Sequence, residues 1–325
     1  MAGVQDAALA IAVSNAGGLG SLPCAMLSPD RMTRELETLA RGTAAPFNVN
    51  FFCHTPPMVD AERERAWRMV LRPYYQELGL DPDDIPDAPA RRPFSHDAAD
   101  VLAAFKPPVV SFHFGLPADD LLRRVRGMGA TILASATTLA EARWLEARGV
   151  DAIVAQGIEA GGHRGNFLTG DMSTQVETLT LVRQMVDAIR VPVIAAGGIA
   201  DAEGVAAAMA LGAAGAQIGT AYLLCPEATT SAVHREAISS DAARDTAVTN
   251  LFTGRPARGI VNRLMRELGP MREGVPAFPL AATALGPLRA RAEAGGRGDF
   301  SPLWAGQHAP RCLAIPAADL TRRLA

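Results

Sequence analysis

Lysine is almost absent from this chain of 325 residues, which has a single one at position 106. Lys106 precedes two prolines at the start of an expected strand, at the end opposite to the one where α/β barrels place their chemistry. Enzymes that form a Schiff base, including those that use pyridoxal phosphate, need a lysine amine in the active site. Such chemistry is therefore excluded.

Cysteine is also scarce, with four residues far apart and no Cys-x-x-Cys pair: Cys24, Cys53, Cys225 and Cys312. This spacing argues against a disulfide framework and against a zinc site, and it fits a reducing compartment. The six histidines are equally scattered, with no pair at the spacing of metal ligands on a helix. We expect no catalytic metal.

Long apolar runs and blocks of like charge are missing as well. No apolar stretch is long enough to span a bilayer, and no basic residue precedes Arg31, so a signal peptide is not expected. The net charge is −3, which favours neither nucleic acid nor a membrane surface as a partner. We expect a soluble cytoplasmic protein, a monomer or homodimer, that acts on a small molecule.

Hydrophobic residues make up 49% of the chain and charged residues 20%, as in a globular protein that can bury a large core. Strand-like and helix-like segments alternate over residues 5–220, which predicts an α/β fold with a parallel sheet. The expected strands are 19–22, 47–52, 109–114, 131–134, 152–155, 192–196 and 214–218.

A closed TIM (β/α)8 barrel has eight strands, and seven are counted here. We expect such a barrel with its first strand upstream of Met1, because the alternative, an open doubly wound sheet, would expose a long apolar edge. The predicted barrel occupies residues 1–225 and contains a helical insertion at about 55–108. A smaller helical domain is expected at 226–298, and a tail, 299–325, is expected to return to the barrel.

The insertion is expected to hold a helix at 59–78, an acidic proline-rich linker at 81–87 and a short helix at 98–105. Trp67, Tyr74 and Tyr75 on the first helix either form a lid over a substrate or pack in a core. The smaller domain is expected to contain helices at 230–244, 259–268 and 280–294.

Residues 151–165 combine a short apolar strand with a glycine-rich loop that contains a histidine. Gln156 ends the strand, Gly161 and Gly162 allow a sharp turn, and His163 has an ordinary pKa near neutrality. This pattern predicts an active-site loop with His163 as the catalytic residue. The alternative is a surface turn whose histidine only hydrogen-bonds the backbone.

Glycines also mark the ends of two neighbouring strands, at Gly197-Gly198 and at Gly219-Thr220. Free backbone N–H groups at such positions of an α/β barrel often bind phosphate, although glycine there also permits tight packing of strand on helix. A bound phosphate indicates a phosphorylated substrate or a nucleotide cofactor. The loop after Gln156 has no cysteine, so a thiolate-dependent dehydrogenase is disfavoured and a cofactor with its own reactivity, such as flavin mononucleotide (FMN), fits.

Five segments, in this order, resemble the nitronate monooxygenase family, flavoproteins formerly called 2-nitropropane dioxygenases, and most of all its bacterial class I branch. The segments are 12–20, 46–50, 155–165, 195–199 and 217–220. The resemblance covers nearly the whole chain and implies that FMN is bound by Asn50, Gln156, Gly161, Gly198, Gln217, Ile218, Gly219 and Thr220. The family's first strand ends in Pro-Met-Ala-Gly over the flavin, of which Met1-Ala2-Gly3 is present here.

The resemblance also implies the reaction, which is oxidation of alkyl nitronates by O2 to a carbonyl compound and nitrite, a detoxification. His163 is then expected to abstract the α-proton of a neutral nitroalkane, or to lie beside the nitronate anion. Arg164 either attracts that anion or faces solvent, and His113 either lines the pocket or is a hydrogen-bonded core residue. The alternatives are an NAD(P)H-dependent quinone or enoyl reductase on the same barrel and, from another class, a non-catalytic ligand-binding barrel.

Overall fold

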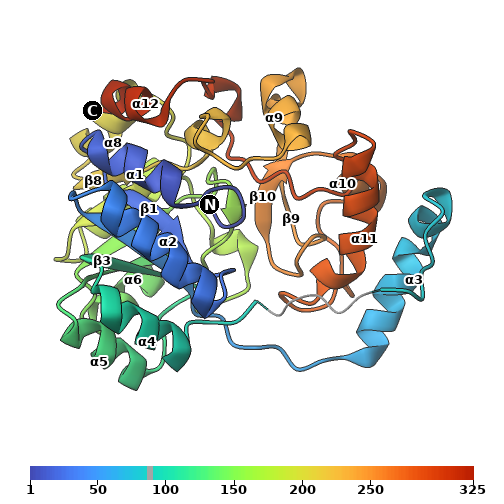
Figure 1. Cartoon of the computed structure of the whole chain (residues 1–325), viewed down its shortest axis with the longest axis horizontal. Helices are drawn as coiled ribbons and strands as arrows, with labels where there is room; N and C mark the ends of the chain where they lie inside the picture. Colours follow the sequence, from blue (N-terminus) through green and yellow to red (C-terminus); the bar gives the residue numbers. More distant parts are fainter. Residues whose placement is uncertain (86–90) are drawn as a thin grey trace.

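The computed structural model describes residues 1–85 and 91–325, and seven parallel strands form its larger sheet (Figure 1). They are β1 (Gly20–Pro23), β2 (Phe47–Phe52), β3 (Val109–His113), β4 (Thr131–Ala136), β5 (Ala152–Gln156), β7 (Val193–Ala196) and β8 (Gly215–Gln217). Neighbours in sequence are neighbours in the sheet, and every pair is parallel. The predicted α/β fold is thereby confirmed. A further strand upstream of Met1 stays a prediction.

Helices that connect these strands pack on one face of the curled sheet. They are α1 (Ala7–Asn15), α2 (Pro29–Gly42), α4 (His96–Phe105), α5 (Asp119–Gly127), α6 (Leu139–Glu146), α7 (Thr178–Val186) and α8 (Ala202–Ala210). Local sequence explains where several of them begin. Ser28 accepts a hydrogen bond from Arg31 N and is followed by proline, and Asp201 accepts one from Gly204 N.

Side chains along the strands alternate between the two faces of the sheet. Apolar side chains join the helices in the main core: Val49, Phe51, Val110, Phe112, Ile132, Ala134, Ile153 and Ala155. The residues between them include a set of polar side chains: Asn48, Asn50, Ser111, His113, Ser135 and Gln156. The face of the sheet turned away from the helices therefore carries the polar side chains that a binding or catalytic site requires.

A second lobe lies beside the barrel (Figure 1, orange). It holds α9 (Ala232–Ser239), α10 (Arg263–Leu268) and α11 (Ala281–Ala294), together with strands β9 (Thr246–Thr249) and β10 (Ala257–Ile260). The predicted helix 259–268 is wrong in its first turn, because Ala257–Ile260 pair with β9 as a strand. Gly259 also makes a bridge with Trp304, so close that a Cβ on it would lie 2.9 Å from Leu303 O.

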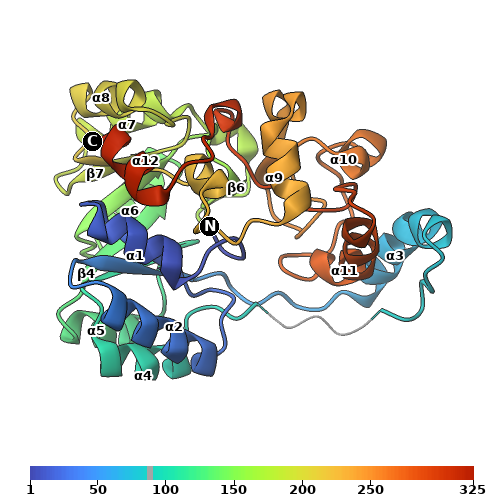
Figure 2. The ribbon, with the colours of Figure 1, turned by 45° about the horizontal axis from the view of Figure 1, so that its top comes forward.

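Helix α3 (Ala61–Glu77) leaves the barrel and packs against α11 of the second lobe (Figure 2). Trp67 and Tyr75 are buried there, and their Nε1–H and O–H groups donate to Ala281 O at 3.3 Å and Ala284 O at 2.6 Å. Of the two interpretations of these rings, core packing is confirmed. The linker predicted at 81–87 is described only as far as residue 85, and its last two residues lie outside the described residues.

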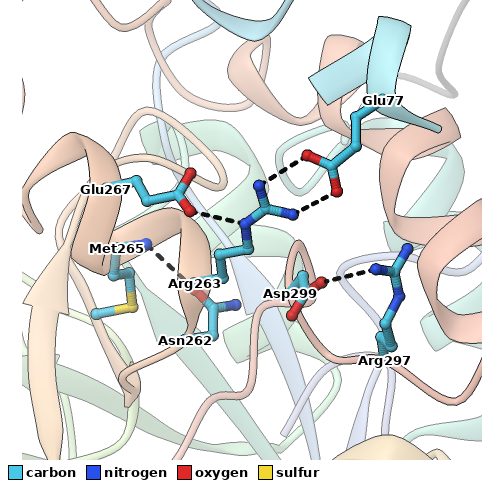
Figure 3. A network of polar contacts seen from close by, with 7 residues as sticks. All are labelled: Glu77, Asn262, Arg263, Met265, Glu267, Arg297 and Asp299. Atoms are coloured by element: carbon cyan, nitrogen blue, oxygen red, sulfur yellow. Dashed lines mark hydrogen bonds and ion pairs between the residues drawn. The ribbon is translucent and has the colours of Figure 1, made fainter. Parts of the chain in front are cut away.

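Figure 3 shows a surface network that joins α3 to α10. Arg263 binds both carboxylate oxygens of Glu77 at 2.7 Å and also binds Glu267 at 2.7 Å. Exposed ion pairs typically contribute about 0.2–1 kcal/mol, and the bidentate geometry of Arg263 with Glu77 favours the upper end of that range. The buried rings of α3 therefore do most to hold this helix on the second lobe.

The C-terminal segment ends in α12 (Ala317–Leu324), which packs against α1 and α8. Among the described residues, no helix has both the length and the apolar character needed to span a bilayer.

Replacing Trp67 by alanine should lower the free energy of unfolding by about 3–5 kcal/mol, because it leaves a cavity in the second core. Tyr75→Phe should cost about 1 kcal/mol for the lost hydrogen bond. Urea denaturation measures both. Met69→Ala on the exposed side of the same helix serves as the control and should change the stability by less than about 0.5 kcal/mol.

Candidate active site

Polar side chains on the inner face of β2 and β3 form a connected group. The amide Nδ2 of Asn48 donates to Ser21 Oγ and Ser111 Oγ, both at 2.8 Å, and Nδ2 of Asn50 donates to Ser111 Oγ at 2.8 Å. Nδ2 of Asn50 also donates to the main-chain carbonyl of Ser111 at 3.3 Å, and because a carbonyl can only accept, this bond fixes the orientation of the Asn50 amide. The Oδ1 atom of Asn48 is buried without a partner among the described residues, so this face carries an acceptor that the chain itself does not satisfy.

The loop after β5 is held by the side chain at the end of that strand. Nε2 of Gln156 donates to His163 O at 2.9 Å, and its Oε1 accepts from Gly165 N at 2.7 Å. One amide therefore closes the loop 157–165 on itself. The sequence predicts Gln156 as a cofactor ligand, and the described contacts leave it one free N–H and one free lone pair for that role.

The sequence left two roles open for Arg164, exposure to solvent or attraction of a substrate anion, and the structure supports neither of them. Arg164 is fully buried and donates to Gln156 O at 2.7 Å, to Gly157 O at 2.5 Å and to Gln175 Oε1 at 2.8 Å. Burial is the main reason that its pKa falls to about 10. The guanidinium acts as a brace for the end of β5.

His163 lies on β6 (Gly162–His163), which pairs with β10 of the second lobe. Its Nε2 is 2.9 Å from Thr253 Oγ1. The Thr253 hydroxyl donates to Arg255 O at 3.4 Å, so it accepts from His163 and the proton is on Nε2. Nδ1 then carries the lone pair of the ring, and the bond from Nε2 to Thr253 is the one hydrogen bond that the imidazole makes with the described residues.

Aromatic rings surround the His163 imidazole. Phe278 lies 5.2 Å away edge-on and Trp304 lies 5.4 Å away, both as distances between ring centroids. Burial lowers the pKa of His163 well below its usual value, and the positive charges of Arg91 and Arg255 lower it further. The ring is neutral at neutral pH and able to accept a proton.

His113 lies on the inner face of the sheet and is hydrogen-bonded through both ring nitrogens, in agreement with one of the two interpretations of this residue. Its Nε2 donates to His163 O at 3.2 Å, because a carbonyl can only accept, and Nδ1 therefore accepts from Ser135 Oγ at 3.0 Å. Burial lowers the pKa of His113 to about 3. His113 thus fixes the backbone of His163 from β3.

The two glycine corners leave the sheet side by side, since Ala196 and Gln217 are partners in the β7–β8 pair. Gly198 has φ +66°, where a side chain is strained, and its neighbour Gly197 has φ +116°. Among the described residues, the backbone N–H groups of Gly198 and Gly219 donate no hydrogen bond. This arrangement fits an anion such as a phosphate.

A carboxylate lies near the same corners. A Cβ on Gly198 would lie 3.5 Å from the Glu159 side chain. Glu159 is engaged elsewhere, because its carboxylate accepts from Thr178 N at 2.9 Å and from Thr178 Oγ1 at 3.0 Å at the start of α7. The positive end of that helix partly offsets its charge.

The C-terminal segment closes this region. Gly306 N donates to Thr220 Oγ1 at 3.0 Å, and a Cβ on Gly161 would lie 2.5 Å from Gly306 N. Gly161 and Thr220, 59 positions apart by their numbers, are therefore brought together through Gly306. Gln217 is exposed, and Ile218 packs against the cluster that includes Ala221 and Leu320.

The N-terminal residues lie at the same end of the sheet. The Met1 side chain is 3.5 Å from where a Cβ of Gly219 would stand, and Val4 O accepts from Thr229 N at 2.9 Å. Ala2 packs on the rings of Phe52, Phe114 and Phe278.

A cavity of about 1160 Å³ opens between the barrel and the second lobe. Its wall includes His54, Phe114, Asn166, Arg255 and Phe278, and none of the predicted site residues. His163 lies behind this wall, in contact with the Phe278 ring.

Sequence reasoning did not identify Thr253, Phe278 and Trp304, which surround His163, or His54 and Arg255, which line the cavity. No local pattern marks any of the first three. The only feature of His54 and Arg255 that could have indicated a site was the charge or hydrogen-bonding capacity of their side chains.

Comparisons with known proteins identify the family of the chain. A family model described as nitronate monooxygenase matches residues 1–325. The chain is 42% identical to a nitronate monooxygenase of Pseudomonas aeruginosa, over 100% of this chain and 93% of that protein. The solved structure of nitroalkane oxidase from Streptomyces ansochromogenes is 37% identical, with a TM-score of 0.91 over 100% of this chain and 92% of that one. FabK from Thermotoga maritima is 29% identical, with a TM-score of 0.74 over 100% and 89%. The chain therefore belongs to the nitronate monooxygenase family.

Proposed function

We propose that this protein is an FMN-dependent enzyme that oxidises alkyl nitronates with O2 to a carbonyl compound and nitrite. One observation carries the proposal within the structure. His163 is a neutral imidazole with a free Nδ1, held by Thr253 and His113 against rings that border a large cavity. The four free thiols are compatible with action in a reducing cytoplasm.

FMN is the proposed cofactor, and it supplies the electron transfer that no side chain of this chain offers. Its proposed contacts are Asn50, Gln156, Gly161, Gly198 and residues 217–220. The free N–H groups of Gly198 and Gly219 suit the phosphate, and the oriented amides of Asn50 and Gln156 suit the ring edge, which needs both donors and acceptors.

His163 is the proposed general base for neutral nitroalkanes. The Nε2–H group is engaged with Thr253, so the α-proton is accepted by Nδ1. A preformed nitronate has already lost this proton, and for that substrate the imidazole only borders the binding site.

We assign the attraction of the substrate anion to Arg255, because the buried Arg164 cannot perform it. The guanidinium carbon of Arg255 lies 3.9 Å from the centre of the Phe114 ring, and Arg255 lines the cavity. Among the described residues it forms no ion pair with a carboxylate, and burial lowers its pKa to about 10. An unpaired guanidinium at a cavity wall favours an anionic ligand.

Anaerobic titration of the FMN-loaded protein tests the function as a whole. A nitronate should bleach the visible absorption of the flavin, O2 should restore it, and nitrite should appear. Removing FMN should abolish nitrite formation, and adding it back should restore it. Fast bleaching by NADH or NADPH, with none by nitronates, would instead support the reductase alternative.

His163→Asn should lower kcat/KM for neutral nitroethane by at least about 100-fold, within the range typical of a lost general base. Its effect on preformed ethyl nitronate should be less than about tenfold. Because the pKa of His163 is lowered, kcat/KM of the unaltered enzyme for nitroethane should stay level as the pH falls through 6.5 and drop only below it. Equal losses on both substrates would remove the role of base.

Arg255→Met should raise KM for ethyl nitronate by about tenfold, since a hydrogen bond to a charged group contributes about 1.5–3 kcal/mol. It should also move the acidic limb of the nitroethane profile to higher pH, because the Arg255 charge lowers the pKa of His163. Arg255→Lys keeps the charge and should retain the position of that limb. Arg65→Met removes an exposed charge from α3 and should change neither quantity.

A further inference from the structure

Two buried hydrogen-bond acceptors without partners among the described residues belong to residues that line the large cavity. They are Nδ1 of His54 and Oδ1 of Asn166, and the two residues are 6% and 5% exposed. They reach the cavity from different parts of the chain, one after β2 and the other after the His163 loop. Native proteins leave few buried polar atoms unpaired, so a pair of them on one cavity calls for a cause.

The identity of the free atom on His54 follows from its one hydrogen bond. Nε2 is 3.1 Å from Arg91 O, which can only accept, so Nε2 carries the proton and Nδ1 carries a lone pair. Burial lowers the pKa of His54, which keeps the ring in this neutral form. Nδ1 is therefore an acceptor that needs a donor.

The same argument fixes the amide of Asn166. Nδ2 donates to Thr169 O at 2.6 Å, so Oδ1 is the free end and is also an acceptor. The Asn166 backbone carbonyl accepts from the Arg255 guanidinium, which places Asn166 beside the cation proposed to attract the substrate.

Among the described residues no group donates to Nδ1 of His54, although the guanidinium groups of Arg91 and Arg255 lie near enough to lower its pKa. Phe278 lies 4.9 Å away and edge-on, and Phe114 lies 6.3 Å away, both as distances between ring centroids. Phe278 also contacts His163, at 5.2 Å between ring centroids. A ligand in the cavity can supply the donor that Nδ1 of His54 lacks, and such a ligand lies one phenyl ring from the proposed base.

We propose that His54 and Asn166 form a subsite for an uncharged hydrogen-bond donor, and that the preferred substrates are nitronates with a hydroxyl group on their alkyl tail. The inference rests on the proposed function and specifies the substrate class. The nitronate anion lies toward Arg255, and the tail hydroxyl donates to Nδ1 of His54 or to Oδ1 of Asn166. A methyl group in place of that hydroxyl leaves both acceptors unpaired, and such sites discriminate against the analogue that lacks the group.

Two carboxylates that do not react test the subsite without turnover, with the carboxylate in place of the nitronate anion. Calorimetry on the FMN-loaded protein compares 4-hydroxybutanoate with pentanoate, which differ by a hydroxyl and a methyl group. The hydroxylated compound should bind about tenfold more tightly, as expected for one hydrogen bond at a buried acceptor. Equal or weaker binding would overturn the proposal and leave ordered water as the partner of these atoms.

His54→Leu should remove the preference and leave the affinity for pentanoate within about twofold. Asn166→Leu gives a second, independent measure if the first variant does not fold. His96→Leu, an exposed histidine on α4, is the matched control and should keep the tenfold preference. A preference unchanged in both cavity variants would overturn the proposal.

Turnover separates this inference from the proposed function. The nitronate of 3-nitropropan-1-ol should have a kcat/KM about tenfold above that of 1-nitrobutane, and His54→Leu should abolish the difference. If neither nitronate is oxidised, the proposed function fails, while the calorimetric ratio still decides whether the subsite exists.

Discussion

The buried guanidinium of Arg164 is the constraint on which the site depends. A charge hidden from water is costly, and here four hydrogen bonds to Gln156 O, Gly157 O and Gln175 Oε1 compensate for it. The first two acceptors are consecutive main-chain carbonyls at the end of β5. They must both turn toward the guanidinium, so the following loop has little freedom in its direction and brings His163 back over the sheet.

The environment of His163 explains how a histidine can serve as a base and still stay neutral. Phenyl and indole rings flank the half-buried imidazole, and its desolvation together with the charges of Arg91 and Arg255 disfavours its protonation. A base with a strongly lowered pKa is a weaker proton acceptor, and the nitroalkane α-carbon is unusually acidic, so the two are matched. In the proposed reaction, the Arg255 charge that attracts an anionic substrate therefore also keeps His163 unprotonated.

Much of the fold could be predicted from the sequence, because its signals are local. The alternation of short apolar runs with helical stretches identifies the parallel sheet, and the glycines after β5, β7 and β8 mark the edge where the chemistry lies. What the sequence did not reveal depends on contacts between distant segments. Thr253 meets His163 across 90 positions, and Trp304 and Phe278 come from still further along the chain. Arg164 was misjudged because its place in a glycine-rich loop suggests exposure, whereas its burial is a property of the tertiary structure.

The pairing of β6 with β10 has a consequence for motion. His163 pairs with a strand of the second lobe and also belongs to a loop of the barrel, so the two parts share the proposed base. If the second lobe rotates relative to the barrel, either His163 moves with the lobe or the backbone hydrogen bonds between β6 and β10 break. Opening of the enzyme and readiness for proton transfer are thus mechanically linked, and amide hydrogen exchange at this short ladder reports on both.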